Sequence, residues 1–217
     1  MATIIGVFDS GIGGLSIANA VRKAFPEADV RFVNDKEHVP YGTKTNKEIF
    51  NLAYPILKKL QDGGCNIIVV ACNTVSTTII KELRQKLSIP LVAIEPMVKP
   101  AAALTKSKVI AVCATPATLA SHRYNELKKD YAQGITVVEP DCANWAELIE
   151  RNSLGRKQIS DTVEEVIKKG ADVIVLGCTH YHWIEEDIKR EVDERAMVIQ
   201  PETAIVRRVQ QVLKQLV

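Results

Sequence analysis

The feature of this sequence that most constrains its fold is an internal repeat that relates one half of the chain to the other. Residues 64–74 align with residues 170–180, so that Cys72 lies over Cys178 at an offset of 106 positions. Two more segment pairs keep nearly this register, at an offset of 105: 4–7 with 109–112, and 92–96 with 197–201. Ordinary βα periodicity explains one such match, but not three in order. We therefore predict two similar halves, each with a Cys after its third strand.

Short apolar runs alternate with longer segments of helical periodicity, which is the pattern of parallel βα units. The short runs are rich in Val and Ile, as expected for strands that helices cover on both faces. The predicted strands are 3–8, 30–34, 67–71, 91–94, 108–113, 135–139, 173–177 and 196–200. The predicted helices are 13–25, 45–61, 75–87, 116–130, 157–169, 181–193 and 202–216.

These elements predict an α/β fold with two similar doubly wound domains and mainly parallel four-stranded sheets, related by a pseudo-two-fold axis. The nearest candidate for a linker is 94–101, close to the midpoint. We expect a first domain at 1–96 plus 201–217, because the terminal helix crosses back, and a second at 97–200. The active site is expected in the cleft between them.

Composition excludes several classes of protein. The chain has 217 residues, with 28 Lys and Arg against 26 Asp and Glu, a near-balance that argues against a nucleic-acid binder. No apolar run approaches the roughly 20 residues that span a membrane, and the N-terminus lacks the basic start of a secretory signal. Five cysteines, an odd number, argue against a disulfide framework. We expect a cytoplasmic protein, and the sequence leaves a homodimer open.

Small polar clusters follow four of the predicted strands. Ligands of parallel sheets bind outside the carboxyl ends of the strands, and each cluster here precedes a helix whose backbone N–H groups can face an anion. The clusters are 9–14 (DSGIGG), 72–74 (CNT), 115–118 (TPAT) and 178–180 (CTH). None contains Lys or Arg, which favours a carboxylate ligand over a polyphosphate. The glycines of 11–14 match neither common nucleotide-binding pattern.

Cys72 and Cys178 are the more specific signal. A Cys at a helix N-terminus is expected to have a lowered thiol pKa. Two such residues facing each other across a cleft can remove a proton from one face of a bound carbon and deliver one to the other face, without a cofactor. The alternative is that both are buried packing residues, as free cysteines often are. The spacing Cys178-x-His180-x-His182 also suggests a metal site, but it lacks a second ligand pair, and we predict no metal.

Four ordered motifs resemble those of glutamate racemases, in the cofactor-independent aspartate/glutamate racemase superfamily. They are 8–15 (FDSGIGGL), 39–42 (VPYG), 71–74 (ACNT) and 177–181 (GCTHY), and the resemblance extends from residue 4 to about residue 213. It implies an isomerase that interconverts L- and D-glutamate without a cofactor and supplies D-glutamate for peptidoglycan. Several features depart from the family pattern: Gln200-Pro201 replaces the usual Asp-Ser or Asp-Gly, the segment around 151–158 is shorter, and His182 replaces a Pro. The stretch before Glu150 is also more polar than its counterpart.

The resemblance also implies roles for individual residues. Cys72 would handle the proton of the D enantiomer and Cys178 that of the L enantiomer, with Asp9, His180 and Glu150 assisting. The substrate-binding residues expected from the motifs and the strand-end clusters are Asp9, Ser10, Pro40, Tyr41, Gly42, Cys72, Asn73, Thr74, Thr115, Thr118, Thr179 and His180. Two other functions remain open: a racemase or isomerase of the same superfamily acting on aspartate or a related acid, and a non-catalytic amino-acid-binding or protein-interacting module.

Overall fold

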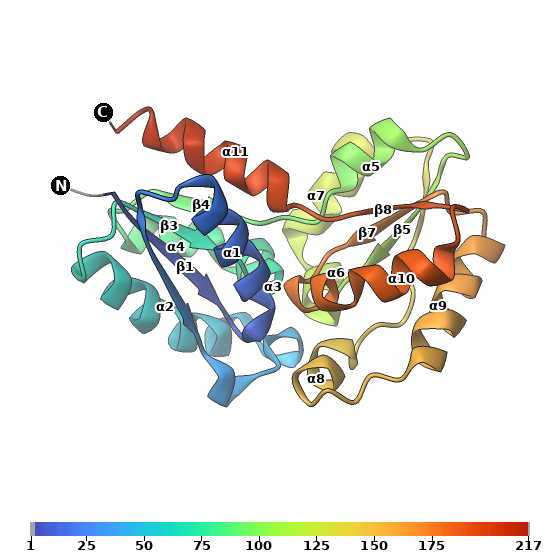
Figure 1. The fold of residues 1–217 in the computed structure, drawn as a ribbon, viewed down its shortest axis with the longest axis horizontal. Coiled ribbons are helices and arrows are strands. Elements are labelled where there is room, and N and C mark those ends of the chain that lie inside the picture. The colour runs from blue at the N-terminus through green and yellow to red at the C-terminus, as the bar shows by residue number, and fades with distance from the viewer. Residues whose placement is uncertain (1–2, 217) are drawn as a thin grey trace.

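The computed structural model describes residues 3–216 and contains two four-stranded parallel sheets (Figure 1). The first sheet has the order β2-β1-β3-β4, and the second has the order β6-β5-β7-β8. The strands are β1 (Ile4–Asp9), β2 (Asp29–Asn34), β3 (Ile67–Val70), β4 (Leu91–Ala93), β5 (Val109–Cys113), β6 (Thr136–Val138), β7 (Val173–Leu176) and β8 (Met197–Ile199). All eight predicted strands, and the predicted fold class, are confirmed.

The two sheets have equivalent strand orders, as the sequence repeat predicts. In each sheet the first and third strands of that half are central neighbours: Val7 pairs with Val69 in one, and Ala111 pairs with Ile174 in the other. The strands of a parallel sheet end at one edge, so the segments after β1 and β3 emerge together, as do those after β5 and β7. This arrangement collects the four polar clusters at two sheet edges.

Helices cover both faces of each sheet. They are α1 (Leu15–Ala24), α2 (Asn46–Asp62), α3 (Asn73–Thr78), α4 (Ile80–Lys86), α5 (Val98–Leu104), α6 (Pro116–Ala120), α7 (His122–Tyr131), α8 (Trp145–Glu150), α9 (Arg156–Lys168), α10 (Glu185–Val192) and α11 (Glu202–Leu213). Four short 3-10 turns join them: η1 (Ile12–Gly14), η2 (Lys36–His38), η3 (Tyr41–Thr43) and η4 (Thr179–Ile184).

The structure corrects several predicted helices. The predicted helix 75–87 corresponds to two helices, α3 and α4, that separate at Ile79, and 116–130 corresponds to α6 and α7. The second break occurs at Ser121, whose extended backbone ends α6 and whose hydroxyl caps α7 by accepting a hydrogen bond from the N–H of Tyr124 at 3.1 Å. Helices α5 and α8 were not predicted, and α5 occupies the second half, 98–101, of the segment interpreted as a linker.

Helix α11 returns from the second sheet to the first (red in Figure 1). Its Ile205 and Val209 are buried in one cluster with Ile5 and Val7 of β1 and Ile17 of α1. Burial of such aliphatic side chains contributes about 1.5–3 kcal/mol each. This contact favours the division into 1–96 plus 201–217 and 97–200, which stays a prediction.

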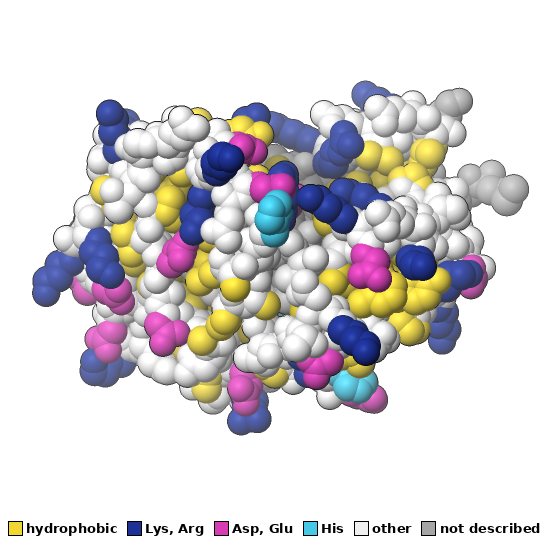
Figure 2. All heavy atoms as spheres, turned by 180° about the vertical axis from the view of Figure 1, so that it is seen from behind, with side chains coloured by type: hydrophobic (Ala, Val, Ile, Leu, Met, Phe, Trp, Pro, Cys, Tyr) yellow, Lys and Arg dark blue, Asp and Glu magenta, His cyan; other side chains and the backbone are white. Residues whose placement is uncertain are grey.

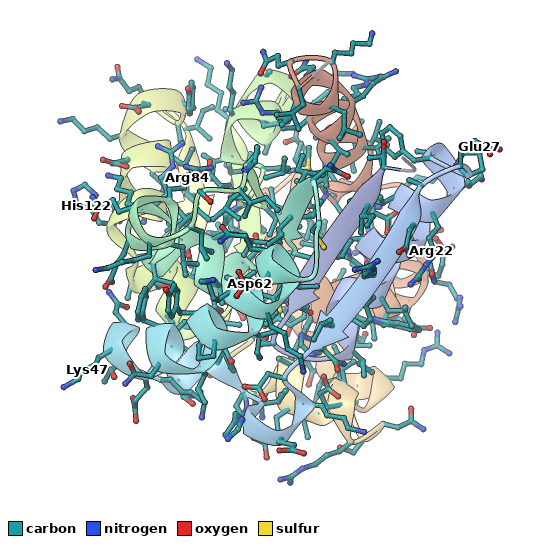
Figure 3. The ribbon with its side chains drawn as sticks, turned by 90° about the vertical axis from the view of Figure 1, so that its left-hand side faces the viewer. Arg22, Glu27, Lys47, Asp62, Arg84 and His122 are labelled. Carbon is teal, nitrogen blue, oxygen red and sulfur yellow. The ribbon has the colours of Figure 1, made fainter. Side chains whose placement is uncertain are left out.

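Most charged side chains lie on the outside of the molecule; Asp9 and Asp35 are buried. Figure 2 shows Lys and Arg interspersed with Asp and Glu on the back face, and Figure 3 shows Arg22, Glu27 and Lys47 at the periphery. Within residues 3–216, no helix is both long enough and apolar enough to cross a membrane.

Candidate active site

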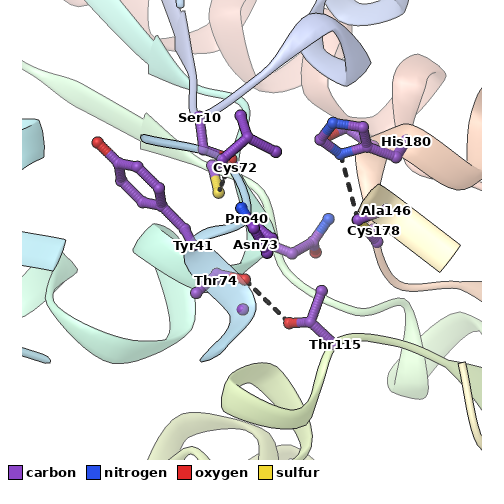
Figure 4. A pocket seen from close by; sticks show the side chains of 13 residues that line it. Ser10, Pro40, Tyr41, Cys72, Asn73, Thr74, Thr115, Ala146, Cys178 and His180 are labelled. Carbon is purple, nitrogen blue, oxygen red and sulfur yellow. Dashed lines mark hydrogen bonds between the residues drawn. The ribbon is translucent and has the colours of Figure 1, made fainter. Parts of the chain in front are cut away.

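A narrow pocket lies between the two halves, at the carboxyl ends of the central strands (Figure 4). Both cysteines of the repeat contribute to its wall, Cys72 from the first half and Cys178 from the second. The lining residues are Ser10, Val39, Pro40, Tyr41, Gly42, Cys72, Asn73, Thr74, Thr115, Ala146, Cys178, Thr179 and His180. The expected cleft between the halves is therefore present as a narrow pocket lined by both apolar and polar side chains.

Most of the predicted site residues line this pocket, but three do not. Asp9, Thr118 and Glu150 lie behind the wall, where each contacts a residue that lines it. Two lining residues were missed, Val39 and Ala146. Both are small and apolar, so they carry no chemical signal in the sequence, and Ala146 lies on α8, which was not predicted.

Cys178, His180 and Glu150 form a chain of polar contacts on one side of the pocket. His180 Nδ1 lies 3.7 Å from Cys178 Sγ, and Nε2 lies 2.7 Å from Glu150 Oε1. Burial acts to lower the pKa of His180, but its hydrogen bonds to Cys178 and Glu150 prevail and raise it to about 10. Burial acts to raise the pKa of Glu150, yet its hydrogen bonds with His180 and the N–H of Ile12 lower it. At neutral pH, His180 is therefore an imidazolium between a carboxylate and a sulfur.

Glycines allow His180 and Glu150 to approach the first half of the molecule closely. A Cβ added at Gly11 would lie 2.1 Å from Glu150 Oε1 and 2.6 Å from His180 Nε2, and one added at Gly13 would lie 2.5 Å from the backbone N of His180. Real Cβ atoms do not come this close to other heavy atoms. The glycines of 11–14, whose backbone N–H groups were expected to face an anion, thus also leave room for His180 of the second half.

The surroundings of Cys72 are different. Its Sγ lies 3.3 Å from Ser10 Oγ, and Asp9 is close behind. Burial, followed by the charge of Asp9, raises the pKa of the Cys72 thiol. The expectation of a lowered thiol pKa at this helix N-terminus is therefore wrong for Cys72, because desolvation outweighs the backbone N–H groups. Cys72 rests as a thiol.

Asp9 joins the two halves beneath the pocket. Its Oδ2 accepts hydrogen bonds from the N–H of Gly14 at 2.6 Å and from Thr179 Oγ1 at 3.1 Å, while its Oδ1 finds no partner among residues 3–216. Burial raises the pKa of this carboxyl group. Asp9 is fully buried and does not line the pocket; it contacts Thr179 and lies near Cys72.

Asn73 presents two unsatisfied polar atoms on the pocket wall. The residue is 2% exposed, and within the described part of the chain neither its amide nitrogen nor its amide oxygen has a hydrogen-bond partner. Leaving a buried polar group unpaired is unfavourable by about 1–3 kcal/mol. Such a side chain is ready for a ligand that offers both an acceptor and a donor, as an amino acid's carboxylate and ammonium groups do.

A chain of threonine hydroxyls crosses the opposite side of the pocket. Thr74 Oγ1 lies 2.9 Å from Thr115 Oγ1, which in turn donates to Thr118 Oγ1 at 3.0 Å. Thr74 belongs to α3 and Thr115 precedes α6, so this contact also joins the halves (Figure 4).

His182 does not join Cys178 and His180 in a metal site. Its Nδ1 lies 3.0 Å from Ser16 Oγ on α1, at the contact between the halves. Among the residues that the structure describes, no group of three or more His, Cys, Asp or Glu is arranged to hold a metal ion. All five cysteines are free and buried.

Comparison with known proteins gives one family. The model of the Asp/Glu/Hydantoin racemase family matches residues 15–209. Among similar curated proteins, the glutamate racemase of Herpetosiphon aurantiacus is 38% identical over 213 residues, covering 96% of this chain and 84% of that protein. The glutamate racemase of Methylococcus capsulatus is 36% identical over 207 residues, covering 94% of this chain and 76% of that protein.

Solved structures agree with this result. Escherichia coli glutamate racemase in complex with L-glutamate and the activator UDP-MurNAc-ala superposes with a TM-score of 0.91 at 29% identity, covering 99% of this chain and 83% of that one. The Francisella tularensis glutamate racemase in complex with D-glutamate gives a TM-score of 0.79 at 30% identity, covering 98% and 81%.

Proposed function

This chain belongs to the Asp/Glu/Hydantoin racemase family, and from that membership we propose that it interconverts L- and D-glutamate by proton transfer between two cysteines. It is a racemase, and a racemase is an isomerase. Glutamate is the proposed substrate because the glutamate racemases of Herpetosiphon and Methylococcus match nearly the whole chain. The D-glutamate formed would supply peptidoglycan synthesis.

The observation that carries the mechanism is that Cys72 and Cys178, at equivalent strand ends of the two sheets, line one pocket. Inversion at a carbon requires that a proton leave one face and another arrive on the opposite face. One sulfur, as a thiolate, forms a bond to the departing Cα proton, and the electron pair stays on the carbon. The other sulfur gives up its S–H proton to that electron pair. Atoms and charge balance without an additional reactant.

The surroundings of the two sulfurs favour different starting roles. Cys72, with its raised thiol pKa, holds a proton and is the acid. Cys178 lies 3.7 Å from Nδ1 of His180, which can hydrogen-bond its sulfur, and it takes the role of the base. This state is prepared for the L enantiomer, since Cys178 is assigned to the L proton. In the opposite direction the two sulfurs exchange roles.

Proton transfer alone provides a rate increase of about 10²–10⁴, which is too little for so weak an acid as Cα–H beside a carboxylate. The developing carbanion must be stabilised by donors that are already in place. We assign this task to Asn73, Thr74 and Thr179, together with the backbone N–H groups at the start of α3 and η4. Ser10, Tyr41, Gly42 and Thr115 complete the binding surface.

The direct test is to follow the circular dichroism of L-glutamate, D-glutamate and both enantiomers of aspartate with the purified chain. Loss of optical activity with both glutamate enantiomers and not with aspartate supports the proposal. Turnover of aspartate alone would show that the substrate is aspartate rather than glutamate. Binding of glutamate without turnover indicates a non-catalytic module.

The assignment of the two sulfurs is tested with single serine variants and a β-chloro analogue of glutamate, from which proton removal alone expels chloride. Neither Cys72→Ser nor Cys178→Ser should racemise glutamate. Cys178→Ser should release chloride from the D analogue, and Cys72→Ser from the L analogue. Equal preference in both variants would show that the sulfurs are not opposed bases, and Cys65→Ser serves as the control because Cys65 lies outside the pocket.

A further inference from the structure

Asp35 is a buried carboxylate outside the pocket, and the mechanism above does not use it. It is 9% exposed and immediately follows β2, where its backbone N–H donates to the carbonyl of Asp9 at 3.3 Å. This places Asp35 at the carboxyl edge of the first sheet, beside the strand that carries Asp9 and Ser10. Its backbone is therefore as firmly placed as the sheet itself.

The carboxylate of Asp35 is shared between two side chains of the following loop. Its Oδ2 accepts a hydrogen bond from Tyr41 Oη at 2.7 Å, and its Oδ1 lies 2.7 Å from Nδ1 of His38. Tyr41 is 2% exposed, whereas His38 lies at the surface. The phenol ring extends from the pocket wall toward the sheet edge, and in Figure 4 its oxygen points away from Cys178 and His180. Tyr41 thus connects the wall of the pocket to Asp35.

The loop that Tyr41 anchors forms one wall of the site. Val39, Pro40, Tyr41 and Gly42 all line the pocket. Gly42 lies so close to the second half that a Cβ added there would be 2.7 Å from the Cβ of Thr115. Any displacement of this loop therefore changes both the pocket wall and its contact with Thr115.

We propose that Asp35 is a positioning residue for substrate binding: through Tyr41 Oη it fixes the loop 39–42 as the wall against which the amino acid is held. This inference rests on the proposed racemisation, because it assigns the loop to the substrate of that reaction. It predicts that loss of the Asp35–Tyr41 hydrogen bond weakens substrate binding and leaves proton transfer at the two sulfurs nearly unchanged.

The chain offers a matched control. Tyr124 is also fully buried, and its hydroxyl donates to Glu139 Oε1 at 2.9 Å. Glu139 directly follows β6, as Asp35 directly follows β2. Neither Tyr124 nor Glu139 lines the pocket. Removal of this second hydrogen bond should lower stability in the same way without moving the loop 39–42.

The experiment measures KM and kcat for L-glutamate, the dissociation constant of L-glutamate by calorimetry, and the melting temperature. Asp35→Ala and Tyr41→Phe should each raise KM and the dissociation constant about tenfold, the magnitude of one hydrogen bond to a charged group. The value of kcat should stay within about twofold.

Asp35→Asn keeps an acceptor oxygen and should recover part of the affinity. The double variant, Asp35→Ala with Tyr41→Phe, should bind glutamate no more weakly than either single variant. Glu139→Ala and Tyr124→Phe should lower the melting temperature and leave KM unchanged.

Several results would overturn the inference. One is a lower melting temperature for the Asp35 and Tyr41 variants with unchanged KM, and another is additive losses in the double variant. If Asp35→Ala does not fold, Tyr41→Phe gives the answer alone. A chain that binds glutamate without racemising it refutes the proposed function, whereas weaker binding in the Asp35 variants would still support the positioning role.

Discussion

Substitution of Gly11 by Ala tests whether the Glu150–His180 contact supports one sulfur and not the other. Gly11 has φ −145° and ψ −157°, an extended conformation that Ala adopts without strain, so only its Cβ matters. That carbon would lie 2.1 Å from Glu150 Oε1, against about 3.5 Å for an unstrained contact. The carboxylate must therefore move by about 1.4 Å, and Nε2 of His180, which lies 2.6 Å from the same carbon, must move away as well. Because Glu150 is only partly buried, its carboxylate can move while the fold survives.

The size of the effect follows from the hydrogen bond that this movement breaks. The Glu150–His180 distance of 2.7 Å would increase beyond hydrogen-bond range. A hydrogen bond between charged groups contributes about 2 kcal/mol, which corresponds to about thirtyfold in rate. His180 acts on Cys178, so chloride release from the L analogue should fall about thirtyfold, while release from the D analogue through Cys72 should stay within about threefold.

The assay compares chloride release from the two β-chloro analogues by Gly11→Ala and by Gly155→Ala. Gly155 is a suitable control because its φ is −80° and a Cβ there meets only Gln158 Oε1, at an ordinary 3.6 Å. Gly155→Ala should change neither rate. Equal losses with both analogues in Gly11→Ala would refute the reasoning, since they would mean that the clash distorts the whole pocket.

Four further outcomes are expected. Asn73→Ala should raise KM for glutamate about tenfold with a stable fold, as measured by kinetics and thermal melting; an unchanged KM would remove Asn73 from the binding surface. Alkylation should inactivate the enzyme and saturating glutamate should protect it, whereas full activity after modification of both Cys72 and Cys178 would exclude their roles. Dialysis against a chelator should leave racemisation unchanged; loss that only added metal restores would contradict this. The raised pKa of His180, about 10 against 6.5, means that its proton stabilises the folded state fully below pH 6.5 and that this contribution disappears as the pH rises through 10. Denaturant titrations should therefore show that the free energy of unfolding of the wild type exceeds that of His180→Gln by less and less across that interval. A difference that grows with pH would contradict the raised pKa.

The strands and the paired cysteines could be predicted from sequence because each has a local signature. Buried parallel strands are continuous runs of Val and Ile, and the repeat places Cys72 and Cys178 at equivalent strand ends. The helices were harder. Pro100 made α5 resemble a linker, yet it lies in the first turn of that helix, where a backbone N–H is not needed for helical hydrogen bonds.

Other parts of the site depend on tertiary contacts that no local pattern encodes. The resting state of Cys72 is set by burial and by Asp9, a residue 63 positions away in sequence, so the helix N-terminus alone gave the wrong direction for its pKa. Glu150 lies behind His180 rather than on the pocket wall. Asp35 has no motif signal at all, because its effect passes through a hydroxyl six residues along the chain.

The return of α11 to the first sheet has a consequence for synthesis on the ribosome. The apolar face of β1 and β3 is covered by α1 together with Ile205 and Val209 of α11. Residues 98–200, with the whole second sheet, therefore emerge before α11 can cover this face of the first sheet. During that interval the earliest strands expose Ile and Val side chains, the kind of surface that chaperones bind and that promotes aggregation. Helix α11, which is translated after the whole second sheet, thus determines when strands β1 and β3 become fully covered.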